Sequence, residues 1–467
     1  MQDWGERMVD ALHDRPPLAG TGQVGEPAPY ADIRVERREI TRLVFRDGEP
    51  ELISSCADHG GMARALWPGC GWGIVTFTRM DFKRHLRRAW KTSQALSGQP
   101  LRLAPAQALN ARAEARLVRD FRSVTLDEKQ ALLRRYSAQL MGGHPKVCSA
   151  TVTYQDSFAQ VYYANTEGSY LYQERPVIDL HLVLVVRDGE QVQRVERPLA
   201  LAAGFEAVEQ REDLVQSALE LATGLLAAKA VKGGRYPVVM DPVLTGLFVH
   251  EAFGHLSEAD FIMANPAAQA MMSLGRRLGP PDLNVVDDGS LPGLRGSLAY
   301  DDEGVPSRRT YLIRAGQLVG RLHSRETAAA LDEQPTGNAR ATSYRHPPQV
   351  RMTNTCIEPG RGGDLAGMLA GVDLGLYACG WLGGETTLGD FTFTAQYARM
   401  IRQGELAEVV RNVTFSANVF ETLANIDRIG SDFAWDEGSG DCGKGEEGLP
   451  VGDGGPHIRV QDVLVGG

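Results

Sequence analysis

The pattern of apolar and polar residues predicts a first part of the chain in which helices and strands are mixed. Residues 2–12 and 79–96 have helical periodicity, and Thr125 begins another helix because Thr-Leu-Asp-Glu forms a capping box. Residues 147–186 are rich in β-branched and aromatic residues and contain turn signals, which is typical of strands. Residues 206–230 return to helical periodicity.

The second part of the chain has mostly strand and turn patterns. A Lys-Gly-Gly segment at 232–234 marks a boundary, and residues 236–240 form an apolar run typical of a strand. Residues 311–320 and 397–406 each have two strand patterns around a glycine and therefore predict hairpins.

A chain of 467 residues exceeds the size at which one core keeps growing, so we expect two domains. The patterns predict an α+β fold. An N-terminal sheet-and-helix domain would cover residues 1–232. A C-terminal domain, mostly antiparallel sheet, would cover residues 233–467 and carry the helix described next.

The most informative stretch follows an apolar run that begins at Pro242 and leads to His250 and Glu251, with His255 five residues after the first histidine. Two imidazoles suit Zn²⁺, and a carboxylate beside them can take a proton from a metal-bound water. A regular helix separates positions i and i+5 by roughly 140°, so both rings can face one ion only if the turn widens, as in a π-bulge. Gly254 tolerates such a distortion because it has no Cβ.

A catalytic zinc ion usually has three protein ligands and one open position. The sequence offers three candidates for the third ligand, which are Glu258, Asp260 and Cys442. Cys442 lies in a polar, acidic, glycine-rich segment, which is a poor place to bury a cysteine for packing, and this favours it as a ligand. Glu258 and Asp260 could instead orient the histidines, or could be solvated acids at the end of a helix.

Composition and charge narrow the classes of function. The formal net charge of −10 argues against a general nucleic-acid binder. No run of 18 apolar residues occurs, and the polar N-terminus lacks the apolar core of a signal peptide, so we expect no membrane partner. The six cysteines are scattered, without a Cys-x-x-Cys pair, which indicates free thiols and a cytoplasmic location.

The motif at residues 249–255 (Val-His-Glu-Ala-Phe-Gly-His) resembles the His-Glu-x-x-x-His signature of the TldD/PmbA family, once labelled modulators of DNA gyrase. The resemblance covers nearly the whole chain. Further similar segments are 29–34, which is similar to the family's N-terminal strand, 343–348 and 351–355 in its central sheet, and 389–393, 442–444 and 450–452 among its C-terminal elements.

The resemblance implies a zinc metallopeptidase that cuts unfolded or extended peptides, in peptide maturation or in proteolytic clearance. It maps the metal ligands onto His250, His255 and Cys442, and the catalytic glutamate onto Glu251. Because all four are present, the resemblance implies the active partner of a dimer. The partner would be a second copy or a PmbA/TldE-like subunit that lacks the ligands.

Two further expectations concern the reaction. Tyr344 or His346 could donate a hydrogen bond to the oxyanion, although an aromatic residue or histidine near Pro-Pro is more often structural. An extended substrate would add a strand to an exposed sheet edge, inside an enclosure that admits only unfolded chains.

Two other classes of function stay open. One is a non-catalytic regulatory or binding protein with a structural zinc, a kind of site that usually has four protein ligands, whereas the sequence identifies three. The other is an inactive subunit of a peptidase pair, which the full set of ligands disfavours.

Overall fold

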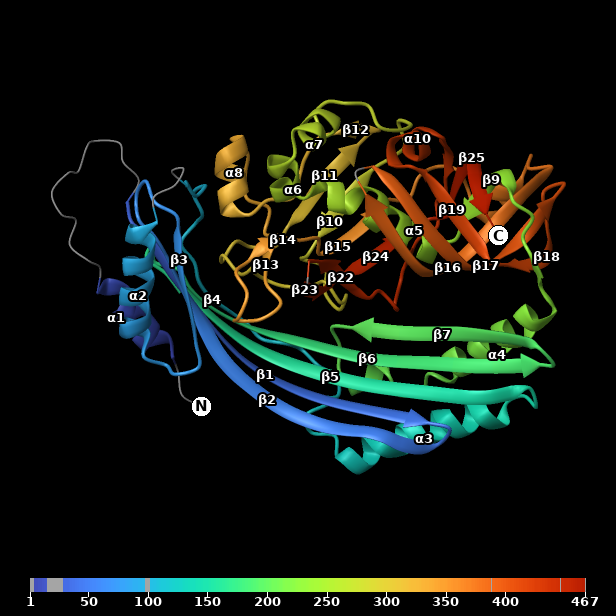
Figure 1. The fold of residues 1–467 in the computed structure, drawn as a ribbon, viewed down its shortest axis with the longest axis horizontal. Coiled ribbons are helices and arrows are strands. Elements are labelled where there is room, and N and C mark those ends of the chain that lie inside the picture. The colour runs from blue at the N-terminus through green and yellow to red at the C-terminus, as the bar shows by residue number, and fades with distance from the viewer. Residues whose placement is uncertain (1–3, 15–27, 97–100, 388, 446, 467) are drawn as a thin grey trace.

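The structure is a computed structural model, and it describes residues 4–14, 28–96, 101–387, 389–445 and 447–466. The first half of the described chain forms one seven-stranded sheet, whose long strands curve around the second half (Figure 1). Its order is β3-β2-β1-β5-β6-β4, with β7 paired to β6. Its strands are β1 (Tyr30–Arg46), β2 (Glu49–Leu66), β3 (Trp72–Phe77), β4 (Asn110–Ala113), β5 (Val147–Asn165), β6 (Tyr170–Asp188) and β7 (Gln191–Leu201).

Helices pack near both ends of this sheet. At one end lie α1 (Gly5–His13) and α2 (Phe82–Ala95), and at the other lie α3 (Leu126–Gly142) and α4 (Glu212–Ala227) (Figure 1). The predicted start of α3 is confirmed, since Thr125 and Glu128 form a reciprocal capping box.

The predicted helix at residues 206–230 is too long. A short 3₁₀ turn, η1 (Phe205–Ala207), comes first, and Gln210 then adopts a positive φ of 45°, which a helix cannot contain. Residues after α4 leave the helix to form β8 (Lys229–Ala230). The periodicity extends too far because Val208 is buried like a helical core residue although it precedes the helix.

The described residues of the second half of the chain form two larger sheets and two small ones. The six-stranded sheet has the order β12-β11-β10-β15-β24-β21, and the eight-stranded sheet has the order β16-β9-β25-β19-β17-β18-β8, with β20 paired to β25. Because β16 also pairs with β17, the strands β9, β16, β17, β19 and β25 close into a ring. The small sheets are β13–β14 and the hairpin β22–β23.

The bounds of these elements are as follows. The strands are β9 (Gly234–Met240), β10 (Val285–Asp288), β11 (Arg309–Arg314), β12 (Gln317–Leu318), β13 (Ala339–Arg340), β14 (Gln349–Val350), β15 (Asn354–Ile357), β16 (Leu374–Thr387), β17 (Asp390–Arg402), β18 (Glu405–Arg411), β19 (Val413–Asn418), β20 (Ile426–Ile429), β21 (Ala434–Trp435), β22 (Asp441–Lys444), β23 (Glu447–Pro450), β24 (Gly452–Gly455) and β25 (Ile458–Gly466). The helices are α5 (Pro242–Val249), η2 (His250–Gly254), η3 (His255–Ser257), α6 (Ala259–Ala264), α7 (Pro266–Met271), α8 (Arg325–Leu331), α9 (Leu365–Leu369) and α10 (Val419–Ala424).

Both hairpins predicted in the second half are confirmed. The turns between β11 and β12 and between β17 and β18 each contain two residues of positive φ, as tight hairpin turns require. Helices together with extensive antiparallel sheet also confirm the α+β class. The division into domains after residue 232 stays a proposal.

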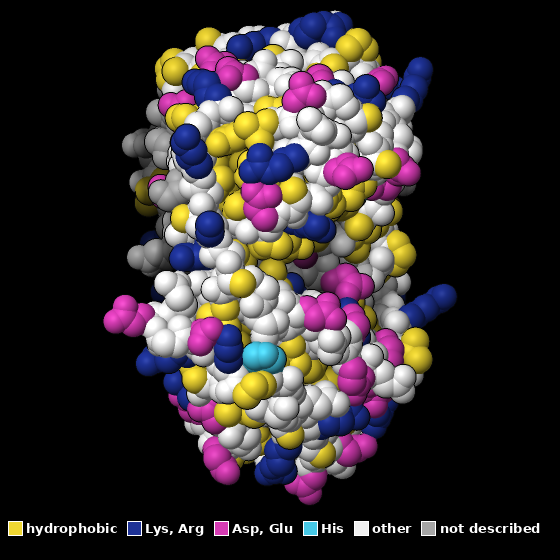
Figure 2. All heavy atoms as spheres, turned by 90° about the vertical axis from the view of Figure 1, so that its right-hand side faces the viewer, with side chains coloured by type: hydrophobic (Ala, Val, Ile, Leu, Met, Phe, Trp, Pro, Cys, Tyr) yellow, Lys and Arg dark blue, Asp and Glu magenta, His cyan; other side chains and the backbone are white. Residues whose placement is uncertain are grey.

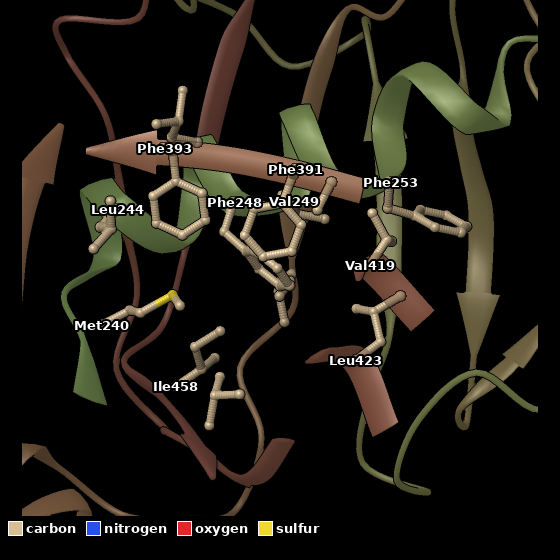
Figure 3. Close-up of a cluster of buried hydrophobic side chains, with 14 of the residues drawn as sticks. Met240, Leu244, Phe248, Val249, Phe253, Phe391, Phe393, Val419, Leu423 and Ile458 are labelled. Atoms are coloured by element: carbon tan, nitrogen blue, oxygen red, sulfur yellow. The ribbon is translucent and has the colours of Figure 1, made fainter. Parts of the chain in front are cut away.

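The helix α5 runs through the apolar core of the second half. Asp241 caps it by accepting a hydrogen bond from the amide of Leu244 at 2.7 Å, and Pro242 occupies its first turn. Figure 3 shows Phe248 beside Phe391 and Phe393, and the rings of Phe248 and Phe391 meet edge to face with centroids 5.7 Å apart. This packing fixes the segment that carries the motif.

Buried ion pairs join the curved sheet to the second half. Arg175 of β6 donates to Asp302 at 3.0 Å, and Arg34 of β1 approaches the same carboxylate at 3.4 Å. Arg64 of β2 lies 3.3 Å from Glu303. The two halves are therefore attached by charged side chains that are far apart in the sequence.

The outer surface mixes both signs of charge. Acidic and basic side chains are interspersed over the described part of the face in Figure 2. In the part of the chain that the structure describes, no helix has both the length and the apolar character needed to cross a membrane.

Candidate metal centre

The helix that carries the motif widens where the sequence predicts. Regular α5 ends at Val249, and residues His250–Gly254 form a π-helical turn before the 3₁₀ turn His255–Ser257. Gly254 has a second reason to be glycine, because an added Cβ would lie 2.0 Å from the sulfur of Met352. The widened turn brings the two imidazole rings together, with centroids 5.1 Å apart.

Three potential metal-ligand atoms converge beside this turn. One donor atom from each of His250, His255 and Cys442 lies within 4.8 Å of the other two. The Cys442 sulfur is 3.3 Å from Nε2 of His255. Two ligands of a tetrahedral zinc ion, bound at ~2.1 and ~2.3 Å, lie about 3.6 Å apart, so the donor set fits a small cation. Neither Glu258 nor Asp260 belongs to this group of donor atoms.

His250 is oriented by a carboxylate that the sequence analysis did not identify. Its Nδ1 lies 2.8 Å from Oδ1 of Asp453, which leaves Nε2 for a metal. Helix α5 can approach β24 so closely because Gly246 faces the backbone of Gly454, where a Cβ would come within 2.7 Å of the amide nitrogen. The sequence signal that could have identified Asp453 is that it is the one acidic residue within Gly-Asp-Gly-Gly at residues 452–455.

His255 has a carboxylate neighbour of its own. Its Nδ1 is 3.7 Å from Oε1 of Glu258, which is 1% exposed. Lys444 donates to Oε2 of Glu258 at 2.8 Å and to Asp260 at 2.7 Å. Of the two acids expected to orient a histidine, Glu258 therefore lies against one, whereas Asp260 accepts hydrogen bonds from Lys444 and from the amides of Val350 and Phe261.

The Cys442 thiol is buried, and the backbone of this residue is held by a hydrogen bond. Arg351, also buried, donates a hydrogen bond to the carbonyl of Cys442. Burial opposes ionisation of the thiol, but the nearby His250 and His255 lower the pKa of Cys442 to about 5. The thiolate is the form that binds metals, so these surroundings suit a ligand.

Glu251 follows His250 in the π-helical turn. Burial raises the pKa of its carboxyl above the usual value, although the two histidines oppose the shift. Its backbone carbonyl accepts a hydrogen bond from Thr386 of β16 at 2.6 Å, and a Cβ at Gly384 would lie 3.6 Å from its Cγ. The glutamate therefore lies against β16.

Tyr344 and His346, the candidate oxyanion donors, make contacts where their loop meets the curved sheet. The Tyr344 hydroxyl donates to Asp58 of β2 at 3.3 Å, and its ring covers Gly60. Nδ1 of His346 is paired with Ser343, and its carbonyl accepts from Arg34. These contacts attach the loop to the curved sheet, and the role of either residue as an oxyanion donor stays a prediction.

Comparison with known proteins found matching family models and curated relatives. Residues 233–467 match the model of the PmbA/TldA metallopeptidase C-terminal domain, and residues 119–231 match that of the central domain. Metalloprotease slr0863 of Synechocystis is 45% identical over 450 residues, which cover 96% of each chain. A zinc metalloprotease TldD homolog of Saccharolobus solfataricus is 33% identical over 346 residues, covering 73% of this chain and 76% of the other.

Two solved structures have the same fold. A putative modulator of a DNA gyrase from Thermotoga maritima superposes with a TM-score of 0.78 at 20% identity, covering 94% of this chain and 96% of the other. TldE from Thermococcus kodakarensis superposes with a TM-score of 0.75 at 17% identity, covering 94% and 97%. At this level of identity the likeness concerns the fold alone.

Proposed function

The chain belongs to the PmbA/TldD metallopeptidase family, and from this premise we propose that it is a zinc-dependent peptidase that hydrolyses unfolded or extended peptides. The metal ligands are His250, His255 and Cys442, and Glu251 is the catalytic base. The observation that carries the proposal is the convergence of these three donor atoms beside a partly buried glutamate. The names of the curated relatives, metalloprotease and zinc metalloprotease, support it.

The donor set favours zinc in a catalytic rather than a structural site. Imidazole and thiolate are ligands that zinc prefers. Among the described residues, the group contains three potential ligands, whereas a structural site usually has four. When bound, the ion supplies Lewis-acid chemistry, which polarises a carbonyl and lowers the pKa of water.

Side chains of the protein orient the proposed ligand His250 and transfer the proton in the proposed reaction. Asp453 holds His250 in one orientation, so that its Nε2 is presented as a neutral donor. Glu251 accepts a proton from the attacking water and returns it to the leaving amine. Its raised pKa suits this task, because a carboxylate of higher pKa holds a proton more readily.

An extended peptide can bind along β16 beside Glu251. This strand pairs with β9 over residues Leu376–Ala378, whereas the residues that follow, up to 387, pair with β17 on the other side. Within the described chain, this leaves one edge of β16 open next to the catalytic glutamate. A substrate that adds a strand there is recognised by its backbone, so its sequence preference is loose.

Loose preference requires a guarded site, and we propose that a dimer encloses it. The partner is a second copy of this chain or a PmbA/TldE-like subunit. Folded proteins without extended segments are then excluded, because they cannot present a free strand to β16. Cleavage of an unstructured peptide alongside a stably folded protein tests this point, and equal rates would contradict it.

The substitution Glu251→Gln tests the proposed function. It removes the base without removing a metal ligand, so zinc content should stay the same while kcat/KM falls by ~10²–10⁴-fold. Zinc analysis of the purified protein and cleavage of an unstructured peptide, with and without a chelator, are the measurements. A metal-free native protein, or a variant that cleaves as well as the native chain, would contradict the proposal.

A further inference from the structure

The cysteine of the candidate metal site lies on the short hairpin β22–β23, which contributes little apolar surface of its own. Cys442 and Lys444 are two residues apart on strand β22, and residues i and i+2 of a strand face the same side. The lysine therefore leaves the hairpin on the side that presents the sulfur to the histidines. What it binds there decides how firmly that side of the hairpin is held.

Lys444 binds acceptors from two separate segments. Its Nζ donates to Glu258 at 2.8 Å and to Asp260 at 2.7 Å, both just after the motif turn, and to the carbonyl of Val350 in β14 at 3.0 Å. An ammonium group has three donors, and all three have acceptors here. Lys444 thus fastens the cysteine hairpin to the segment that follows His255.

These contacts close a ring that passes through the metal site. From Lys444 the ring runs to Glu258, whose other oxygen is 3.7 Å from Nδ1 of His255. Nε2 of the same imidazole is 3.3 Å from the Cys442 sulfur, and Cys442 leads back along β22 to Lys444. Any movement of the hairpin away from the motif turn must therefore break the lysine contacts.

We propose that Lys444 is a positioning residue for the metal site. It sets the separation between the Cys442 sulfur and the imidazole of His255, and it holds Glu258 against that imidazole. The inference rests on the proposed function, because it assumes that these donor atoms bind zinc. Lys444 itself is no ligand and contacts no substrate.

A purely structural role makes a different prediction. The Lys444 side chain is 25% exposed, and it could simply add stability as surface ion pairs sometimes do. Removing it would then lower the melting temperature of the metal-free protein and leave zinc affinity unchanged. A positioning role predicts that zinc affinity falls in a protein that remains folded.

The test compares Lys444→Met and Lys444→Arg with Lys83→Met as the matched control. Lys83 lies on α2 and makes an exposed ion pair with Asp10 at 2.7 Å. Zinc dissociation constants come from chelator competition on folded, metal-free protein, and the thiolate-to-cobalt absorption of the Co²⁺ form reports the Cys442 bond. Lys444→Met should weaken zinc binding about tenfold to a hundredfold and reduce the cobalt–thiolate band, whereas Lys83→Met should change neither.

Lys444→Arg should give an intermediate loss, because a planar guanidinium keeps the charge but not the compact three-way contact. If Lys444→Met does not fold, this variant decides the question. Native zinc affinity and an unchanged cobalt–thiolate band in a folded Lys444 variant would overturn the inference and leave the proposed function standing. Absence of zinc binding by the native chain would overturn the proposed function, and the inference with it.

Discussion

The two halves of the candidate metal site are held in place by different forces. The histidines leave α5, whose side chains Leu244, Phe248 and Val249 are completely buried in an apolar core. The cysteine lies on a hairpin fastened by cations, among them Arg351 at its backbone and Lys444 beside it. Apolar packing is non-directional and tolerates changes in pH, whereas ionic contacts require particular partners in particular protonation states. The site thus combines a half held mainly by apolar packing with a half held mainly by ionic contacts.

The largest expected effect comes from the apolar half. Phe248→Ala should lower the free energy of unfolding by about 3–5 kcal/mol, because it leaves a cavity against Phe391 and Phe393. Denaturant unfolding of the metal-free protein measures it. The control is Leu374→Ala at an exposed position of β16, which should stay within about 0.5 kcal/mol of the native value. Equal effects of the two substitutions would show that the helix is not held by packing.

Cys442→Ser should have the opposite effects to Phe248→Ala, with a large loss of zinc affinity and a small change in the free energy of unfolding. A serine hydroxyl is a much poorer zinc ligand than a thiolate, so zinc affinity should fall by more than the ~100-fold typical of residues that merely orient a ligand. The free energy of unfolding of the metal-free protein should change by less than in Phe248→Ala. Chelator competition and denaturant unfolding on the same preparation give both numbers. A serine variant with native zinc affinity would remove the hairpin from the site.

Asp453→Asn tests whether the carboxylate on β24 orients the proposed ligand His250. The neutral amide no longer favours the proton on Nδ1 of His250, so zinc affinity should fall about tenfold to a hundredfold while the fold persists. Chelator competition again measures the change. Asp432→Asn is a suitable control, because Asp432 pairs with His457 rather than with a proposed ligand. A loss of equal size in both variants would point to a general effect of charge.

The smallest expected effect concerns the ionic attachment of the curved sheet. Burial raises the pKa of Asp302, but Arg175 and Arg34 outweigh it and lower the pKa to about 2. A carboxyl whose pKa is depressed on folding stabilises the protein above its unfolded value of about 3.9 and loses that contribution as the pH falls towards 2. The contribution is at most about 2–3 kcal/mol.

Asp302→Asn should therefore flatten the acid side of the stability curve. The free energy of unfolding of the native chain should fall more steeply than that of the variant between pH 4 and the onset of acid unfolding. Unfolding curves at a series of pH values measure the difference. Parallel curves for the two proteins would show that this carboxylate does not couple the halves electrostatically.

The sequence predicted the half of the site held by apolar packing better than the half held by ionic contacts, for a physical reason. His250, Glu251 and His255 are adjacent in the chain, and their spacing together with Gly254 indicates the widened turn that the structure contains. Asp453 and Lys444 meet their partners across 203 and 186 residues, and no local pattern encodes such a contact. Cys442 could be favoured only indirectly, through its polar surroundings.

Elsewhere in the fold, the sequence correctly predicted a helix cap and two hairpin turns, because residues close together in the chain determine them. The capping box at Thr125 and the hairpin turns of positive φ are specified by neighbouring residues. The predicted extent of α4 was wrong because Val208, which precedes the helix, is buried by tertiary packing at a position that continues the helical periodicity. The open edge of β16 depends on where β9 ends, and this is a property of the folded sheet.

The most direct test of the account is X-ray absorption spectroscopy at the zinc edge of the purified native protein. Two imidazoles and one thiolate predict one sulfur at about 2.3 Å and nitrogen or oxygen ligands at about 2.0–2.1 Å. The sulfur should disappear from the spectrum of Cys442→Ser. A coordination shell without sulfur in the native protein would contradict the central claim that the helix and the hairpin share one metal ion.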